Sequence, residues 1–170
     1  MSDVRRTVHN HVESNPGVHF NELTRALDIA TGQAQYHLRR LRDGESVTVE
    51  RVRGRTHYFP PGYDAWERRT IALLRRETVR AIVVRALADG APSEADLAED
   101  LDVARSTVSH HVSTLIEAGV AEKCYDERAR SHVTLTRPEE TRRLLDEVTP
   151  SLPEKLVDRF TRVVDDTLCD

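Results

Sequence analysis

Two stretches of the sequence repeat one another at an offset of 74 residues. Residues 23–41 (LTRALDIATGQAQYHLRRL) align without gaps with residues 97–115 (LAEDLDVARSTVSHHVSTL). The identical pairs are Leu23/Leu97, Leu27/Leu101, Asp28/Asp102, Ala30/Ala104, His37/His111 and Leu41/Leu115. Because these matches have the spacing of a helical core, we interpret the repeat as one folding unit present twice.

The first copy contains a helix-turn-helix pattern followed by two short alternating runs. Apolar spacing predicts helices over about residues 3–13, 21–27 and 31–42, after an extended stretch at 18–20. We expect the second helix to bury Leu23, Ala26 and Leu27, and the third to bury Ala34, Leu38 and Leu41. The runs 47–52 and 55–59 predict a β-hairpin with Arg53 and Gly54 at its tip.

The second copy has the same order of elements. Helices are predicted over residues 78–90 and 105–118, and Ser93 with Asp96 resembles a capping box that opens the helix between them. Residues 120–125 and 132–136 predict a second hairpin. The fold class is therefore mainly α with small β-wings. The expected domains are two winged helix-turn-helix units (1–62 and 78–137), a linking helix (63–77) and C-terminal helices (138–170).

Charge is distributed unevenly along the 170 residues. The whole chain has a net charge of −4, but residues 1–90 carry +4 and residues 91–170 carry −8. A protein that contacts phosphates needs local positive charge, so the N-terminal half is the better candidate for binding nucleic acid. The acidic, lysine-poor composition is also typical of proteins from a high-salt, halophilic cytoplasm.

Other classes of function find little support in the sequence. No apolar run is long enough for a membrane span and no signal peptide is evident, so we expect a cytoplasmic protein. A Gly-rich phosphate loop, a nucleophile elbow and a carboxylate cluster are all missing, so we expect no enzyme activity and no cofactor. The two cysteines, Cys124 and Cys169, have no CxxC or CxC partner, and adjacent histidines such as His110 and His111 suit chelation poorly. We therefore predict no metal site.

The motifs resemble those of known regulators. NPGVHFNELTRALDIATGQAQYHLRRL resembles the first domain of archaeal tandem winged helix-turn-helix transcription regulators, and STVSHHVSTLIEAGV is similar to the recognition helix of ArsR- and MarR-type repressors. The resemblance covers about residues 1–60 and 78–136. It implies that the third helix of each copy enters the major groove and that the wing reaches the flanking backbone or minor groove. The usual pattern has Gly in the turn and Ser as the cap of the third helix, whereas this chain has Asp28 with Ala30 and Asp102 with Ala104. We therefore expect the left-handed turn residue at Asp28 and Asp102. We expect the helix caps at Thr31 and at Arg105-Ser106.

The candidate DNA-binding residues lie on the polar faces of the third helices and on the wings. Gln can pair with adenine, and Arg with guanine or phosphate, whereas the alternative interpretation is a solvated surface. The candidates of the first copy are Thr31, Gln33, Gln35, Tyr36, Arg39 and Arg40, with Arg51, Arg53 and Arg55 on its wing. The candidates of the second copy are Arg105, Ser106, Thr107, Ser109, His110 and Ser113, with Arg128 and Arg130 on its wing. The first set has the stronger basic character.

The C-terminal tail contains a further amphipathic helix. Its apolar stripe consists of Leu156, Phe160, Val163, Val164 and Leu168. This stripe either covers the second domain or pairs with a second copy of the chain, and we favour a homodimer because related regulators dimerise through flanking helices. The leading hypothesis is a sequence-specific regulator that occupies promoters on double-stranded DNA, with any small-molecule effector unknown. The alternative is a winged-helix adaptor that binds proteins of the transcription machinery.

Overall fold

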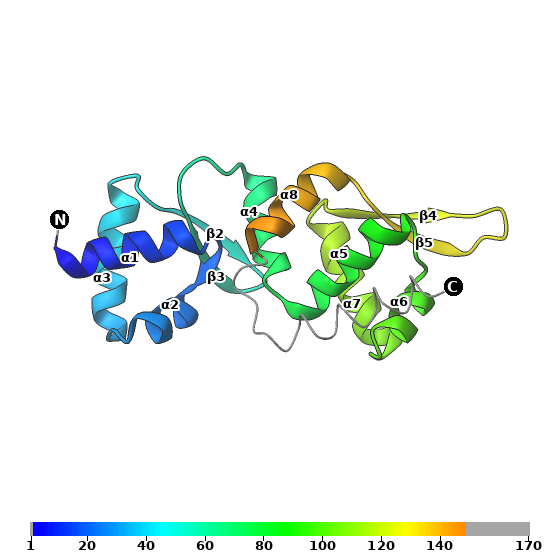
Figure 1. Ribbon diagram of the computed structural model, residues 1–170, viewed down its shortest axis with the longest axis horizontal. Helices are drawn as coiled ribbons and strands as arrows, with labels where there is room; N and C mark the ends of the chain where they lie inside the picture. The colour runs from blue at the N-terminus through cyan, green and yellow to red at the C-terminus, as the bar shows by residue number, and fades with distance from the viewer. Residues whose placement is uncertain (1, 149–170) are drawn as a thin grey trace.

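The computed structural model describes residues 2–148, which form an elongated molecule with two helical units along its length (Figure 1). The described helices are α1 (Asp3–Ser14), α2 (Phe20–Leu27), α3 (Thr31–Asp43), α4 (Ala65–Leu74), α5 (Glu77–Asp89), α6 (Glu94–Asp100), α7 (Arg105–Glu117) and α8 (Pro138–Val148). The strands of this part are β1 (Val18–His19), β2 (Thr48–Val52), β3 (Arg55–Phe59), β4 (Ala121–Tyr125) and β5 (Ser131–Leu135). None of the described helices is long and apolar enough to cross a membrane.

The first unit packs α1, α2 and α3 around a small aliphatic core. Val8, Leu23 and Leu38 are buried at its centre. Helix α2 begins at Phe20, which we expected to be extended, because the Nδ1 atom of His19 accepts the Glu22 backbone N–H and so caps the helix one residue earlier. Ala26 is exposed, contrary to our expectation. The apolar stripe of α2 runs through Phe20, Leu23 and Leu27 at i, i+3 and i+7, which leaves Ala26 on its solvent flank.

The turns before α3 and α7 have the same backbone in both units. Asp28 and Asp102 each have a φ of 50°, the left-handed conformation that the sequence predicts at these positions. The expected caps are wrong, however. Helix α3 begins after Ala30 and α7 begins after Ala104, and neither alanine can make a side-chain cap. The first backbone N–H groups of α3 and α7 therefore lack a side-chain acceptor.

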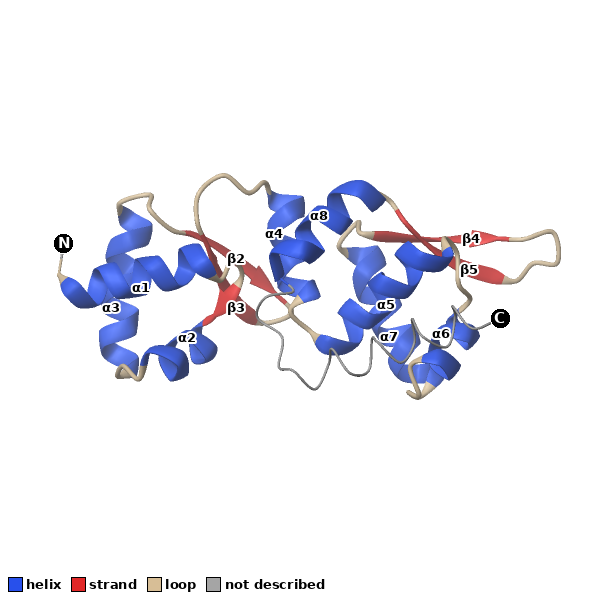
Figure 2. Cartoon of the chain, viewed as in Figure 1, coloured by secondary structure: helices blue, strands red, loops and turns tan. Residues whose placement is uncertain are grey.

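The hairpin β2–β3 has a tight tip. Val52 pairs with Arg55, so the loop has two residues, Arg53 and Gly54, and both have positive φ values (52° and 77°). Such a loop matches the natural twist of a hairpin, which explains the well-defined register. Strand β1 adds to the other edge of β3. The second hairpin, β4–β5, has a longer loop and projects away from the helices (Figure 2).

Helix α4 connects the two units by packing into a shared core. Val52 and Phe59 of the first hairpin belong to the same buried cluster as Ile71 of α4 and the apolar residues of α5 and α7. On the first unit, Arg68 pairs with Glu50 at 3.0 Å. On the second, the indole Nε1 of Trp66 donates to the Gly119 carbonyl at 2.9 Å. Helix α4, in the segment predicted as a linking helix, is thus part of the core that both units share.

Candidate nucleic-acid interface

The outward face of α3 is open to solvent over most of its length. Ala34, Leu38 and Leu41 hold the opposite face on the core. The six predicted DNA-binding residues of this helix are all exposed: Thr31, Gln33, Gln35, Tyr36, Arg39 and Arg40. Tyr36 stands out because its large aromatic side chain is 56% exposed on the surface of the helix and does not pack into the core. The helix therefore presents amide, aromatic and guanidinium groups to a partner.

A groove runs between α3 and the hairpin β2–β3. Its cavity volume is about 470 Å³. The groove is lined by Gly32, Gln35, Tyr36, Leu38, Arg39, Arg42, Val49, Thr56 and Tyr58. The polar members from α3 lie on one stripe of the helix, whereas Gln33 and Arg40 lie on its flank. We call this feature the α3 groove.

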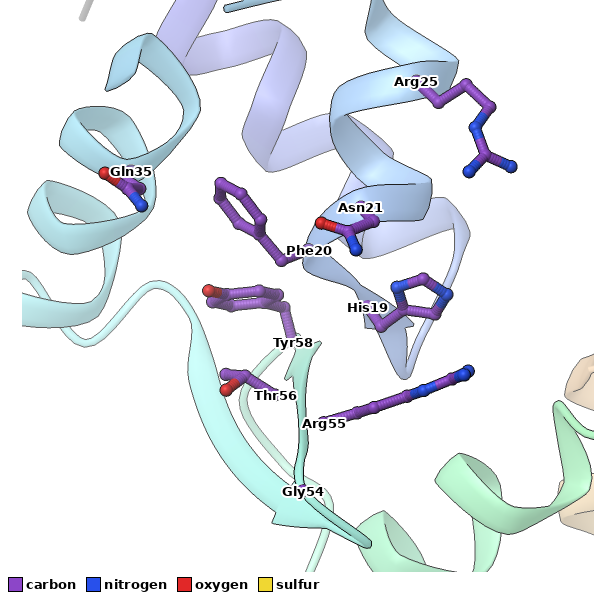
Figure 3. Close-up of a pocket in the computed structure, with 9 residues that line it drawn as sticks. All are labelled: His19, Phe20, Asn21, Arg25, Gln35, Gly54, Arg55, Thr56 and Tyr58. Atoms are coloured by element: carbon purple, nitrogen blue, oxygen red, sulfur yellow. The ribbon is translucent and has the colours of Figure 1, made fainter. Parts of the chain in front are cut away.

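A second hollow of about 610 Å³ adjoins the α3 groove and shares Gln35, Thr56 and Tyr58 with it. Figure 3 shows its walls: Gln35 from α3, Phe20, Asn21 and Arg25 from α2, and Tyr58, Thr56 and Arg55 from β3. The two cavities thus form one continuous concave surface. It joins α3 to the wing of the first unit.

Several residues of this concave surface were not among the predicted candidates, namely Asn21, Arg25, Arg42, Thr56 and Tyr58. Alternation in β3 places Thr56 and Tyr58 on the face opposite buried His57 and Phe59, so the sequence held a signal for them. Nothing local in the sequence brings Arg25 of α2 to the same hollow, because its position depends on how α2 packs against the sheet.

The free positive charge of the surface comes from arginines. Within the described residues, no carboxylate lies within ion-pairing distance of the side chains of Arg39, Arg40, Arg51 or Arg55. Arg51 pairs across the hairpin with Thr56, so its side chain lies on the same face of the hairpin as Thr56, which lines the α3 groove. Burial lowers the pKa of His19 below its usual value, and the nearby Glu22 carboxylate only partly offsets this effect. The His19 ring is therefore neutral near pH 7. The guanidinium groups are therefore the groups available for phosphates.

Arg53, at the tip of the first wing, lies against the second unit. Its Nη2 atom donates to Nε2 of His110 at 3.3 Å, and its Nη1 atom lies 3.6 Å from Oε2 of Glu117. Both partners belong to α7. The three arginines predicted on this wing thus have different surroundings. Arg51 and Arg55 are exposed and have no carboxylate partner within residues 2–148, whereas Arg53 contacts the other domain.

The predicted residues of α7 are divided between solvent and internal contacts. Arg105, Ser106, His110 and Ser113 are exposed, and Thr107 is half-buried. Ser109 donates to Oε2 of Glu94 at 2.8 Å, and Glu94 also pairs with Lys123 at 2.7 Å. Burial raises the pKa of Glu94, but the hydrogen bonds from Lys123 and Ser109 outweigh it and lower the pKa overall. Ser109 therefore helps to hold α6 and β4 against α7.

The loop of the second wing carries the last two predicted candidates. Arg130 pairs with Asp126 at 2.7 Å, while the side chain of Arg128 is exposed. The backbone N–H of Arg130 is the main cause of the low pKa of Asp126, so this carboxylate stays charged and neutralises part of the loop. The predicted dimerisation residues Leu156, Phe160, Val163, Val164 and Leu168 lie outside the described residues.

Two helix-turn-helix units, each followed by a β-hairpin wing and joined by α4, define a tandem winged helix-turn-helix protein. Comparisons with known proteins agree. Residues 2–71 match the model of an N-terminal helix-turn-helix domain, and residues 77–124 match the model of a helix-turn-helix domain. These matches confirm the predicted tandem fold.

A curated relative was also found. The chain is 27% identical over 120 residues to an uncharacterized HTH-type transcriptional regulator of Methanocaldococcus jannaschii. The aligned region covers 71% of this chain but only 30% of that protein. The chain therefore shares part of its length with a longer archaeal protein.

Proposed function

We propose that this chain is a sequence-specific DNA-binding transcription regulator that acts by occupying promoters, without catalysis. The observation that carries the proposal is the continuous concave surface between α3 and the first wing, whose arginines Arg39 and Arg55 have no carboxylate partners among the described residues. Unpaired guanidinium groups beside an exposed recognition helix are what a polyanionic duplex requires.

The side chains divide into two roles in this proposal. Gln35 and Arg39 of α3 line the α3 groove and carry the amide and guanidinium groups that pair with adenine and guanine edges in the major groove. Arg51 and Arg55 contact phosphates, which fix the position of the helix but do not select a sequence. The backbone N–H groups at the start of α3, which have no side-chain cap, are further donors for a phosphate.

The name of the Methanocaldococcus jannaschii relative, a transcriptional regulator, supports the same role. In our proposal the chain works as a homodimer on an inverted repeat whose half-sites are separated by whole turns of the duplex. Light scattering of the protein with and without its DNA measures this stoichiometry.

The test is a fluorescence anisotropy titration with a duplex selected from genomic DNA by the wild-type protein. The double variant Arg39→Glu/Arg40→Glu should bind at least about a hundredfold more weakly, because favourable contacts become repulsive, and its salt dependence should become shallower by about two counterions. The matched control is Arg6→Glu/Arg142→Glu, which makes the same charge change at exposed arginines on α1 and α8. Equal affinities for the two double variants would refute the assignment of α3.

The adaptor hypothesis makes a different prediction in the same experiment. A winged-helix protein that binds only other proteins should show weak affinity for random duplex and no steep dependence on salt. A wild-type protein that selects no genomic fragment and has a flat salt profile would therefore favour the adaptor.

A further inference from the structure

The wing of the first domain covers part of the recognition helix of the second. Arg53 contacts both His110 and Glu117, through the hydrogen bond and the ion pair described above. The side chain of Arg53 is only 37% exposed, although it stands at a hairpin tip where side chains are normally surrounded by water. The tip of this wing is therefore an interdomain contact.

The two partners of Arg53 lie on the outward face of α7. Ser106, His110, Ser113 and Glu117 follow one another at spacings of four, three and four residues, which places them on one stripe of the helix. The internal repeat aligns Ser106, His110 and Ser113 with Gly32, Tyr36 and Arg39, all of which line the α3 groove. Arg53 thus occupies the stripe of α7 that corresponds to the proposed DNA-binding stripe of α3.

Other contacts fix the wing in this place. Val52 and Phe59, at the two ends of the hairpin, are buried in the core that includes α5 and α7. Trp66 of α4 donates to the carbonyl of Gly119, which lies two residues after Glu117. Arg68 of the same helix pairs with Glu50 of the hairpin. An exposed ion pair alone is weak, but here α4 holds both sides of the contact in register.

Charge also favours this contact over one with DNA. Residues 91–170 carry a net charge of −8, and Glu117 adds a carboxylate to the outward stripe of α7. At this stripe Glu117 repels a phosphate backbone and attracts the cationic tip of the wing. The corresponding stripe of α3 also ends in a carboxylate, Asp43, but Asp43 is paired with Arg42 at 3.2 Å, and the stripe carries Arg39 where α7 has the uncharged Ser113.

We infer that the outward face of α7 is a docking surface for the first wing of the same chain, and that α7 stays outside the major groove when the protein binds DNA. Each chain then presents a single recognition helix, α3, and Arg53 is an interdomain residue rather than a DNA ligand. This inference rests on the proposed function, because it assigns the DNA contacts to one of the two units.

The first experiment compares two variants that each add one negative charge at an exposed position of a recognition helix. Gln35→Glu in α3 should weaken binding to the selected duplex by about tenfold or more, because it removes a base contact and repels phosphate. Ser113→Glu in α7 should leave the affinity within about twofold of wild type. If Ser113→Glu weakens binding as much as Gln35→Glu does, the inference is wrong and the proposed function stands. If neither variant changes the affinity, the assignment of α3 to DNA fails instead.

The second experiment locks the contact itself. In a Cys124→Ser/Cys169→Ser background, Arg53→Cys and His110→Cys are joined by a short bismaleimide linker, and the uncrosslinked protein serves as the control. We expect efficient crosslinking within one chain and a DNA affinity within about twofold of the control, because DNA binding leaves this interface closed. Failure to crosslink, or a loss of affinity of about tenfold or more after crosslinking, would overturn the inference. Circular dichroism of each variant verifies that it is folded.

Discussion

At the scale of single residues, Gly17 shows how little space separates the first unit from α4. Its φ of 79° lies in the left-handed region, and an added Cβ atom would lie 2.7 Å from Cγ2 of Ile71 and 3.2 Å from Cε1 of Phe59. The Nδ1–H group of buried His57 also donates to the Gly17 carbonyl at 2.7 Å. Only glycine satisfies both the backbone conformation and the close approach.

We therefore expect Gly17→Ala to lower the free energy of unfolding by about 2–4 kcal/mol, from backbone strain and overpacking together. Gly32→Ala is the matched control, because Gly32 lies in α3 and an added Cβ would meet nothing within 4 Å. There the same substitution should raise stability by about 0.5–1 kcal/mol through helix propensity. Urea denaturation of both variants measures the difference, and equal effects would show that Gly17 is not constrained.

At the scale of elements, the helices differ in how they begin. Helices α4 and α6 open with complete capping boxes, formed by Asp64 with Glu67 and by Ser93 with Asp96. The capping box of α6 confirms the one that the sequence predicted at Ser93 and Asp96. Helices α3 and α7 begin after alanines instead. A DNA-binding helix gains from free N-terminal N–H groups, but α7, in our inference, has no such use for them.

Adding a cap to α7 should therefore stabilise the protein at no functional cost. Ala104 has the extended backbone of a capping residue (φ −60°, ψ 141°). Ala104→Ser should raise the free energy of unfolding by about 0.5–1 kcal/mol and leave the DNA affinity unchanged. The control is Ala88→Ser, at an exposed position inside α5. It should lower the free energy of unfolding by about 0.5 kcal/mol, because serine is a weaker helix former than alanine. Thermal denaturation and anisotropy titrations check both properties, and weaker DNA binding by Ala104→Ser would contradict our view of α7.

At the scale of the whole molecule, the two units share one large core. The cluster that contains Trp66 extends from Val52 of the first hairpin to Val148 of α8. Figure 1 shows α4 and α8 between the two units, and Arg143 of α8 pairs with Glu67 of α4. The second unit therefore cannot lose its structure without exposing apolar residues of the first.

This shared core predicts a single cooperative unfolding transition. Trp66 is the only tryptophan of the chain and lies at the junction, so its fluorescence reports on the interface. The denaturation curves from Trp66 fluorescence and from far-UV circular dichroism should coincide, because both follow the loss of one core. Two separated midpoints would show that the units unfold independently.

The sequence by itself determined the local elements of this protein. The repeat, with its helical spacing, defined two helix-turn-helix units, and the alternating runs defined both hairpins, with Arg53 and Gly54 at the first tip. Left-handed turns at Asp28 and Asp102 also followed from residue type. These features depend on neighbours along the chain, for which periodicity and backbone preference are sufficient.

Only the tertiary structure decided which of the polar residues are free to bind a partner. Arg51, Arg53 and Arg55 look equivalent in the sequence, yet Arg53 is bonded to His110, 57 residues away, while the other two have no carboxylate partner in the described part of the chain. Ser109 is a polar residue on a helix predicted to bind DNA, but its hydroxyl donates a hydrogen bond to Glu94. Contacts over such separations depend on how α4 packs into the shared core, and a charge pattern along the chain does not encode that geometry.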